Sequence, residues 1–361
     1  MYKSFTIKNF RCFSKLTIEP LERVNLVAGM NNVGKTALLE ALWLHHGYQN
    51  PSLGLKADIF RGVDRFKLDE IMWTLFLDFD PSRSIEISSI DFNDLSAVLK
   101  INIRQLPSSV VPIERAREMR NRNDTSGPAI VSKKTEEQPA VEVLFDYSDF
   151  SGHHSQARAF PREKEIEFIS GQKAKETLGI YLAARVPYSM DELAERLGNL
   201  QITKKENQVV RILQIIEPSL VDLNVLPRGG APLIFGDIQK ERLVPLPLMG
   251  DGMMRLLNMA LSIKAAPGGI LLVDEIENGI HHSLMVKVWT AISQLARECE
   301  TQIVATTHSR ECIIAAAKAF TQSDEFDFRY HRFEKVDGEI RSVAYDRDAL
   351  EGAIEIDLEM R

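Results

Sequence analysis

The stretch that decides the fold is GMNNVGKTALLEAL, residues 29 to 42, a polar bend between two aliphatic runs. Its first eight residues fit the pattern G-x-x-x-x-G-K-[ST] of a phosphate-binding P-loop. Residues 23 to 28, RVNLVA, are typical of a buried strand, and Leu38, Leu39 and Leu42 recur after the bend at helical spacing. The strand, the bend and the helix come in the order that a P-loop requires; the alternative is an ordinary glycine turn.

The residue types in the bend suit the chemistry of a phosphate. Gly34 lets the backbone approach an anion, and the main-chain N–H groups and the positive end of the helix face the same point. Lys35 is expected to bridge the β- and γ-phosphates of a nucleotide, and the Thr36 hydroxyl to ligate Mg²⁺. The expected nucleotide-binding residues are Asn31, Asn32, Val33, Gly34, Lys35, Thr36 and Ala37.

A second motif, GGILLVDE at residues 268 to 275, is an aliphatic strand that ends in two acids. A P-loop needs a carboxylate partner for its metal, so Asp274 is the expected second Mg²⁺ residue, acting through water. Glu275 is suited to polarising the attacking water. Taken alone, this run is equally typical of a plain strand end; the P-loop upstream favours the functional interpretation.

Two further features accompany these motifs. PLPLMGDGMMRLLNMAL, residues 245 to 261, has Gly250 and Gly252 at the head of an apolar helix, where an anion can bind. ATTHS, residues 305 to 309, ends a predicted strand with His308, from which the imidazole can reach a γ-phosphate. Taken singly, the glycine pair is more often a turn and the histidine more often structural.

The composition of the chain is that of an ordinary globular protein. Its 361 residues carry a formal net charge of -7, which argues against a protein that coats nucleic acid and leaves room only for a local DNA contact. No segment approaches the roughly 20 apolar residues that span a bilayer, and no secretory signal is evident, so we expect a cytoplasmic protein without a membrane partner. Cys12, Cys299 and Cys312 lack the spacing of a zinc site or a disulfide framework.

Hydrophobic patterns predict the organisation around the motifs. Helical spacing predicts a helical subdomain within residues 171 to 217, and alternating strands and a helix in the last third predict a parallel sheet. Residues 107 to 139 are rich in charge, Pro and Ser and are expected to form a mobile insertion. Strands of an antiparallel lobe are predicted at residues 72–79, 85–90, 98–104 and 141–147.

Together these motifs carry a family resemblance. The sequence from residues 6 to 43, GDGMMRLL at 250 to 257 and DEIENGIHHSL at 274 to 284 resembles the ABC-type ATPases of SMC and RecF proteins, and above all the OLD-like, AAA-core group. The resemblance implies an α/β P-loop NTPase of ABC-ATPase type, with a parallel-sheet core, an antiparallel β lobe and a small helical subdomain. Predicted parts are an N-terminal ATPase lobe with the P-loop, the mobile insertion, a β/helical insert subdomain and a C-terminal ATPase lobe, at residues 1–106, 107–139, 140–242 and 243–361.

The resemblance also implies a homo-oligomer in which ATP is sandwiched between two subunits. The signature residues Gly250, Asp251, Gly252 and Arg255 would then contact the partner's ATP in trans. Gly250 stands where many relatives have serine, and no Mg²⁺-sensing glutamine is evident, so hydrolysis is expected to be slow. Arg11 and Phe13 match positions near the nucleotide in relatives, or are simply strand residues of the lobe.

Relatives of this build differ in the domain that comes after the ATPase. OLD nucleases add a Toprim domain, but only 53 residues (361 minus 308) come after His308, and they are predicted to form two strands and a short acidic helix. The resemblance therefore implies an ATPase that controls a separately encoded nuclease or toxin, often in anti-phage defence, as in Septu or PARIS systems. The alternatives are a RecF- or SMC-like DNA-repair ATPase and a scaffold that binds nucleotide without hydrolysing it.

Overall fold

A computed structural model describes residues 1–62, 71–106, 140–161, 166–169, 178–184, 186, 188–323 and 325–355. The predicted insertion at residues 107–139 lies outside this part of the chain. In the part that is described, no helix is both long and apolar enough to cross a membrane.

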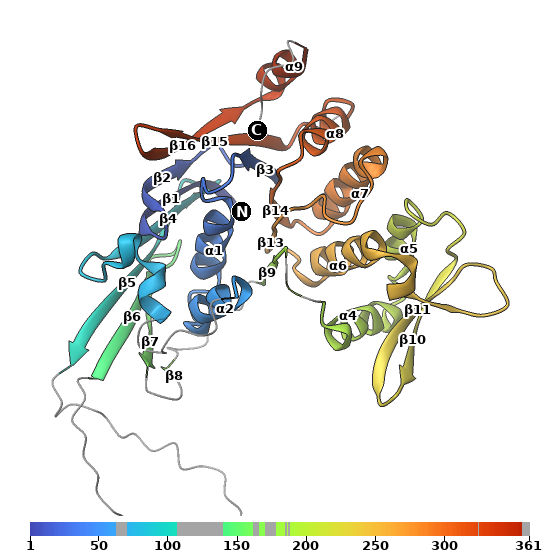
Figure 1. Cartoon of the computed structure of the whole chain (residues 1–361), viewed down its shortest axis with the longest axis horizontal. Coiled ribbons are helices and arrows are strands. Elements are labelled where there is room, and N and C mark those ends of the chain that lie inside the picture. Colours follow the sequence, from blue (N-terminus) through green and yellow to red (C-terminus); the bar gives the residue numbers. More distant parts are fainter. Residues whose placement is uncertain are drawn as a thin grey trace, which may run out of the picture.

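A six-stranded sheet forms the centre of the fold, with the order β16-β15-β3-β14-β13-β9 (Figure 1). The neighbours from β15 to β9 run parallel, and β16 pairs antiparallel with β15. The carboxyl ends of the parallel strands therefore meet at one edge, as the sequence predicted for the last third. The strands are β3 (Val24–Gly29), β9 (Gly179–Leu182), β13 (Ile270–Val273), β14 (Gln302–Thr306), β15 (Phe328–Val336) and β16 (Glu339–Tyr345).

A seven-stranded sheet, with the order β2-β1-β4-β5-β6-β7-β8, makes the antiparallel lobe. Three of its strands match predictions at 85–90, 98–104 and 141–147. β5 pairs with β6 from Val98 opposite Ser148 to Leu106 opposite Ala140. The same sheet therefore contains strands from two of the predicted parts, residues 1–106 and residues 140–242. The strands are β1 (Tyr2–Phe10), β2 (Phe13–Ile18), β4 (Ile85–Asp91), β5 (Ser96–Leu106), β6 (Ala140–Ser148), β7 (His154–Pro161) and β8 (Ile166–Ile169).

Helix α1 (Lys35–His46) lies between these two sheets (Figure 1). Leu38 and Leu42 belong to one buried cluster with Ile87 of the lobe and with Leu272 and Val304 of the central sheet. The helix that comes after the P-loop is therefore fixed on both sides, which holds its first turn in place.

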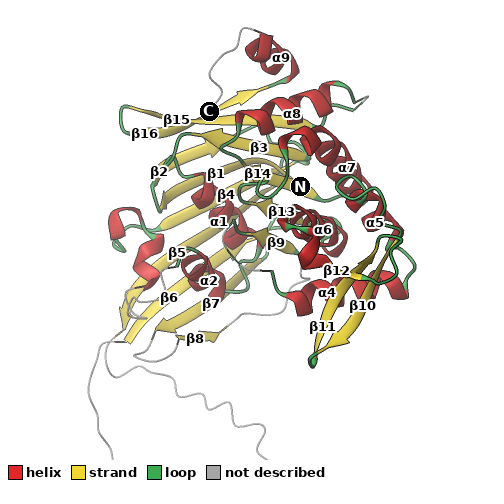
Figure 2. Cartoon of the chain, turned by 45° about the vertical axis from the view of Figure 1, so that its right-hand side comes forward, coloured by secondary structure: helices red, strands yellow, loops and turns green. Residues whose placement is uncertain are grey.

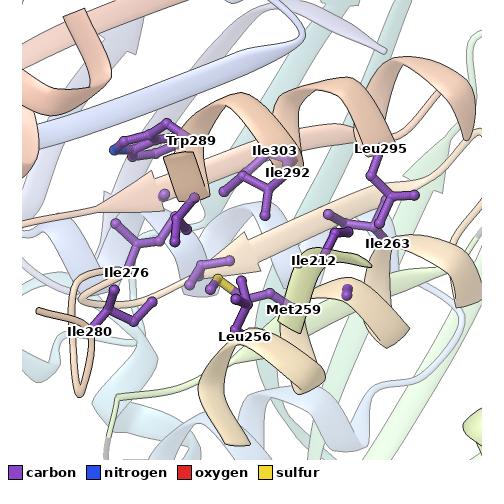
Figure 3. Packing of buried hydrophobic residues seen from close by; sticks show 14 of the residues in the cluster. Ile212, Leu256, Met259, Ile263, Ile276, Ile280, Trp289, Ile292, Leu295 and Ile303 are labelled. Atoms are coloured by element: carbon purple, nitrogen blue, oxygen red, sulfur yellow. The ribbon is translucent and has the colours of Figure 1, made fainter. Parts of the chain in front are cut away.

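The other face of the central sheet is covered by α6 (Asp251–Ala265), α7 (Met285–Glu298) and α8 (Arg310–Thr321). Figure 3 shows Leu256 and Met259 of α6, Trp289 and Ile292 of α7 and Ile303 of β14 in one cluster. α9 (Arg347–Glu355) comes after β16, as the expected short acidic helix.

The helical subdomain contains α4 (Met190–Ile202) and α5 (Asn207–Leu213), with a small sheet of β10 (Asp222–Arg228), β11 (Ala231–Asp237) and β12 (Val244–Pro245) beside them (Figure 2). The short helix η3 (Leu246–Met249) comes directly after β12. The helical prediction for 171–217 was wrong at β9, which joins the central sheet beside β13. A four-residue apolar run has no period of its own, and its partner strand lies far away in the sequence. Residues 171–177 of that range lie outside the described residues.

The predicted strand at 72–79 was also wrong. These residues form two 3-10 helices, η1 (Met72–Leu75) and η2 (Leu77–Phe79), after α2 (Ser52–Phe60). Met72, Leu75 and Phe76 are spaced by three and one, so a helical turn buries all three against the lobe. Asp78 and Phe79 have positive φ angles of 53° and 57°, which no strand allows.

Candidate active site

The P-loop is built by the junction of β3 and α1. Gly34, with φ of 86°, precedes the helix, and no side chain caps the helix N-terminus, so its first N–H groups remain available to an anion. A Cβ on Gly34 would lie 2.5 Å from Cζ of Phe13 and 2.7 Å from Sγ of Cys12. Glycine is therefore required both for the backbone angle and for the contact with the β1–β2 turn.

Lys35 is folded back into this loop. Its Nζ donates hydrogen bonds to the carbonyl oxygens of Gly29 at 2.7 Å and Met30 at 2.9 Å. Burial lowers the pKa of the ammonium to about 8, opposed by the negative charges of Asp274, Glu275 and Glu277. The carboxylates predicted from the distant strand thus act on the lysine electrostatically.

Thr36 and Asp274, 238 positions apart, meet directly. The Thr36 hydroxyl donates to Asp274 Oδ2 at 3.2 Å, and the Thr306 hydroxyl donates to Asp274 Oδ1 at 2.6 Å. Burial raises the pKa of Asp274, although both hydroxyls favour its charged form. A hydroxyl beside a carboxylate fits the hard oxygen ligands of Mg²⁺, and the described residues contain no cluster of three His, Cys, Asp or Glu side chains that could hold a metal by themselves.

Glu275 comes next, with a left-handed backbone, φ 50°, and a partly exposed carboxylate. Its Oε1 lies 4.0 Å from Nε2 of His308, which comes directly after β14, and its Oε2 accepts a hydrogen bond from Asn278 at 2.8 Å. The structure therefore brings together Lys35, Thr36, Asp274, Glu275 and His308 at the carboxyl edge of the parallel strands.

Sequence reasoning missed two supporting residues. Glu277 accepts hydrogen bonds from the main-chain N–H groups of His308 at 2.9 Å and Ser309 at 3.2 Å. Thr306 accepts one from the Glu275 N–H at 2.9 Å. The position of Thr306 at a strand end, two residues before His308, was a signal in the sequence for a residue at the site. Its partners Asp274 and Glu275 could not be predicted, because they lie more than 30 positions away along the chain.

The signature residues lie at the head of α6. Gly250, with φ of 104°, and Asp251 are exposed, and a Cβ on Gly252 would lie 2.4 Å from the Gly279 carbonyl oxygen. Arg255 does not fit its expected role in trans. Its side chain is buried and donates to the carbonyl oxygens of Asp274 and Glu275 of its own chain, because one helical turn carries it from the exposed head into the core.

Arg11, in the turn between β1 and β2, and Phe13, the first residue of β2, lie beside α1 and the P-loop respectively. Arg11 donates to Glu40 Oε2 of α1 at 3.2 Å and to the Thr74 carbonyl oxygen at 3.0 Å, and pairs with Asp58 of α2 at 2.7 Å. Phe13 packs against Gly34. Arg11 was expected either near the nucleotide or as a structural residue of the lobe. In the structure its guanidinium contacts α1, α2 and η1, which favours the structural interpretation.

Known proteins are similar to this chain in sequence or in fold. The chain is 22% identical over 347 residues to an "ATP/GTP phosphatase" of Helicobacter pylori, covering 90% of each, and 22% identical over 366 residues to "Endonuclease GajA" of Bacillus cereus. The second match covers 93% of this chain but 59% of GajA, so the chain spans little more than half of that relative. An SMC head solved with the C-winged helix domain of ScpA has the same fold, with a TM-score of 0.54 at 14% identity, covering 98% of this chain and 99% of the head.

A family model, "AAA domain, putative AbiEii toxin, Type IV TA system", matches residues 24–313, which is most of the chain. With the P-loop already described, the protein belongs to this AAA family and is an ATPase with the fold of an SMC head.

Proposed function

We propose that this ATPase is a nucleotide-dependent dimerisation switch that controls a partner effector. The observation that carries the proposal is the direct contact of Thr36 with Asp274, beside Glu275 and His308. It joins the groups that bind a nucleotide to the groups that can split one.

The chemistry assigned to these residues is hydrolysis of the β–γ bond of ATP. On binding, the phosphates replace the carbonyl oxygens that now hold the Lys35 ammonium. Glu275 orients a water whose oxygen bonds to the γ-phosphorus, and the proton of that water passes to Glu275 Oε1. The β–γ bridging bond breaks, its electron pair stays on the ADP oxygen, and Lys35 stabilises the developing charge.

Thr36 and Asp274 would hold a Mg²⁺ ion, which neutralises charge on the phosphates when it is bound. His308 is proposed to donate a hydrogen bond to the γ-phosphate.

Dimerisation is proposed to use the exposed head of α6. Gly250 and Asp251 face solvent rather than the core, and a helix N-terminus favours an anion. The γ-phosphate bound by one chain would be capped by this head in a second copy, so that ATP joins the subunits and hydrolysis releases them. Arg255 is no longer part of this surface.

The effector is proposed to be a separately encoded nuclease or toxin in anti-phage defence. Support comes from the family description, which connects AAA domains of this kind with a putative toxin and a Type IV toxin–antitoxin system, and from the similarity to an endonuclease. Both findings indicate the class of effector, a toxin or a nuclease. In such a system this chain would supply the ATPase.

The test is the mass of Glu275→Gln in solution, measured by light scattering with and without ATP and Mg²⁺. Because the variant lacks the Glu275 carboxylate that acts as the base, bound ATP should stay intact. The measured mass should be that of a dimer with MgATP and that of a monomer without it. Adding Lys35→Ala to the same chain is the control and should abolish the doubling. A Glu275→Gln protein that binds ATP but stays monomeric would contradict the switch.

A further inference from the structure

Arg255 is a buried cation whose hydrogen-bond partners are main-chain oxygens. Only 2% of the residue is exposed, and the same terminal nitrogen donates to the carbonyl oxygens of Asp274 at 2.5 Å and Glu275 at 3.1 Å. The Nε atom has no hydrogen-bond partner among the described residues. Burying a guanidinium on neutral carbonyls contributes little stability in return for its desolvation, which favours a role beyond packing.

The carbonyl oxygens that Arg255 holds belong to a strained part of the backbone. Glu275 is in the left-handed region, which is unfavourable for a residue with a Cβ and persists only where neighbours enforce it. Thr306 of β14 binds the Glu275 N–H, and the Ile276 N–H donates to the Thr306 carbonyl oxygen at 3.0 Å. Arg255 supplies a further restraint, and it comes from α6.

The head of α6 and the loop after Glu275 are in close contact. The ideal Cβ of Gly252 would meet the Gly279 carbonyl oxygen at 2.4 Å, and that of Gly279 would meet Asp251 at 3.1 Å. A displacement at the head of α6 is therefore passed both to this loop and, through Arg255 one turn later, to the Glu275 backbone.

We propose that Arg255 is a positioning residue, which aims the Glu275 carboxylate and makes that aim depend on the position of α6. The inference rests on the hydrolytic role proposed for Glu275. It assigns to Arg255 a role within its own subunit: the surface that caps a partner's nucleotide is linked to the catalytic carboxylate of the same chain, so the two sites of a dimer sense each other.

The test is Arg255→Met, with three quantities measured on the same preparation: ATP affinity, ATP-dependent association and kcat. Because Arg255 holds Glu275 rather than the nucleotide, kcat should fall by at least about tenfold while ATP affinity changes by less than about twofold. Arg255→Lys, which keeps the charge on a shorter stem, should recover part of kcat.

The matched control is Arg297→Met. Arg297 of α7 is a partly buried arginine, with 23% of its side chain exposed, and pairs with Asp327 at 2.6 Å; its loss should lower stability but leave kcat of the folded protein unchanged. A parallel fall of ATP affinity and kcat in Arg255→Met would mark a merely structural role and overturn the proposal.

If Arg255→Met does not fold, Arg255→Lys is the deciding variant. Wild-type kcat in folded Arg255→Met, or in Arg255→Lys where only that variant folds, would also overturn the proposal. A wild-type protein that hydrolyses ATP without associating would instead contradict the dimer switch, while leaving the effect of Arg255 on kcat measurable.

Discussion

The charge of the Lys35 ammonium should respond to a bound nucleotide. In the free protein burial holds its pKa at about 8, below its ordinary value of 10.5. Bound phosphates favour the charged form and raise that pKa. Above pH 8, binding therefore takes up a proton, and ATP affinity should fall as pH rises, by at most about tenfold per pH unit.

Calorimetry in two buffers of different ionisation enthalpy measures this proton uptake directly. Uptake should be clear at pH 9 and close to zero at pH 7. Lys3→Met is the control, because Lys3 lies half exposed near the start of β1 and pairs with Asp94. Equal uptake at both pH values would contradict the assignment to Lys35.

Thr306 offers a second prediction at this scale, because valine has nearly its shape without the hydroxyl. Thr306→Val removes the hydrogen bonds to Asp274 and to the Glu275 N–H, so neither carboxylate is held in its position. Hydrolysis should fall by about tenfold to a hundredfold, as expected for small misplacements at a reacting centre. Thr306→Ser keeps the hydroxyl and should retain most of the rate; equal rates for Val and Ser variants would refute this role.

At the scale of elements, Glu40 joins three parts of the fold. It is 1% exposed on α1, accepts from Arg11 of the β1–β2 turn, and pairs with Arg61, which comes after α2, at 2.6 Å. Glu40→Gln removes the buried negative charge that pairs with Arg11 and Arg61 and leaves Asp58 as the one carboxylate paired with Arg11 among the described residues, so the free energy of unfolding should fall by about 3 kcal/mol in urea denaturation.

Glu192→Gln is the matched control for that change. Glu192, whose side chain is 57% exposed, pairs with Arg196 one turn along α4; because its carboxylate is solvated and Arg196 keeps its hydrogen bond to Ser262, losing the pair should cost about 0.5 kcal/mol or less. Similar losses in the two variants would contradict the claim that the α1 network is a buried, structural one.

The elements also show how much could be predicted from the sequence. The P-loop, the strand that ends in Asp274 and the helix headed by Gly250 were predictable, because each is encoded by neighbouring residues. β9 was not predictable, since its four residues become a strand only beside β13. The role of Arg255 was also missed, because its partners lie 19 and 20 positions away, on a strand end that packs under α6.

At the scale of the whole molecule, a head-to-tail dimer predicts complementation between defective subunits. Lys35→Ala disables the P-loop. Gly250→Val disturbs the exposed head of α6, because valine does not tolerate the φ of 104° at this position. Each should be inactive alone. A mixture should recover roughly a quarter of wild-type activity, because half of the dimers are mixed and each has one complete site. Mixtures as inactive as their components would argue for sites built within one chain.

The most direct test of the central claim, that Lys35, Asp274 and Glu275 converge on one magnesium nucleotide and split it, is single-turnover phosphate release. Wild-type protein with ATP should release phosphate when Mg²⁺ is added and none in excess chelator. Glu275→Gln should bind ATP equally well but release phosphate at least about a hundredfold more slowly. Release from Glu275→Gln at the wild-type rate, or ATP binding without release by the wild-type protein, would contradict the account.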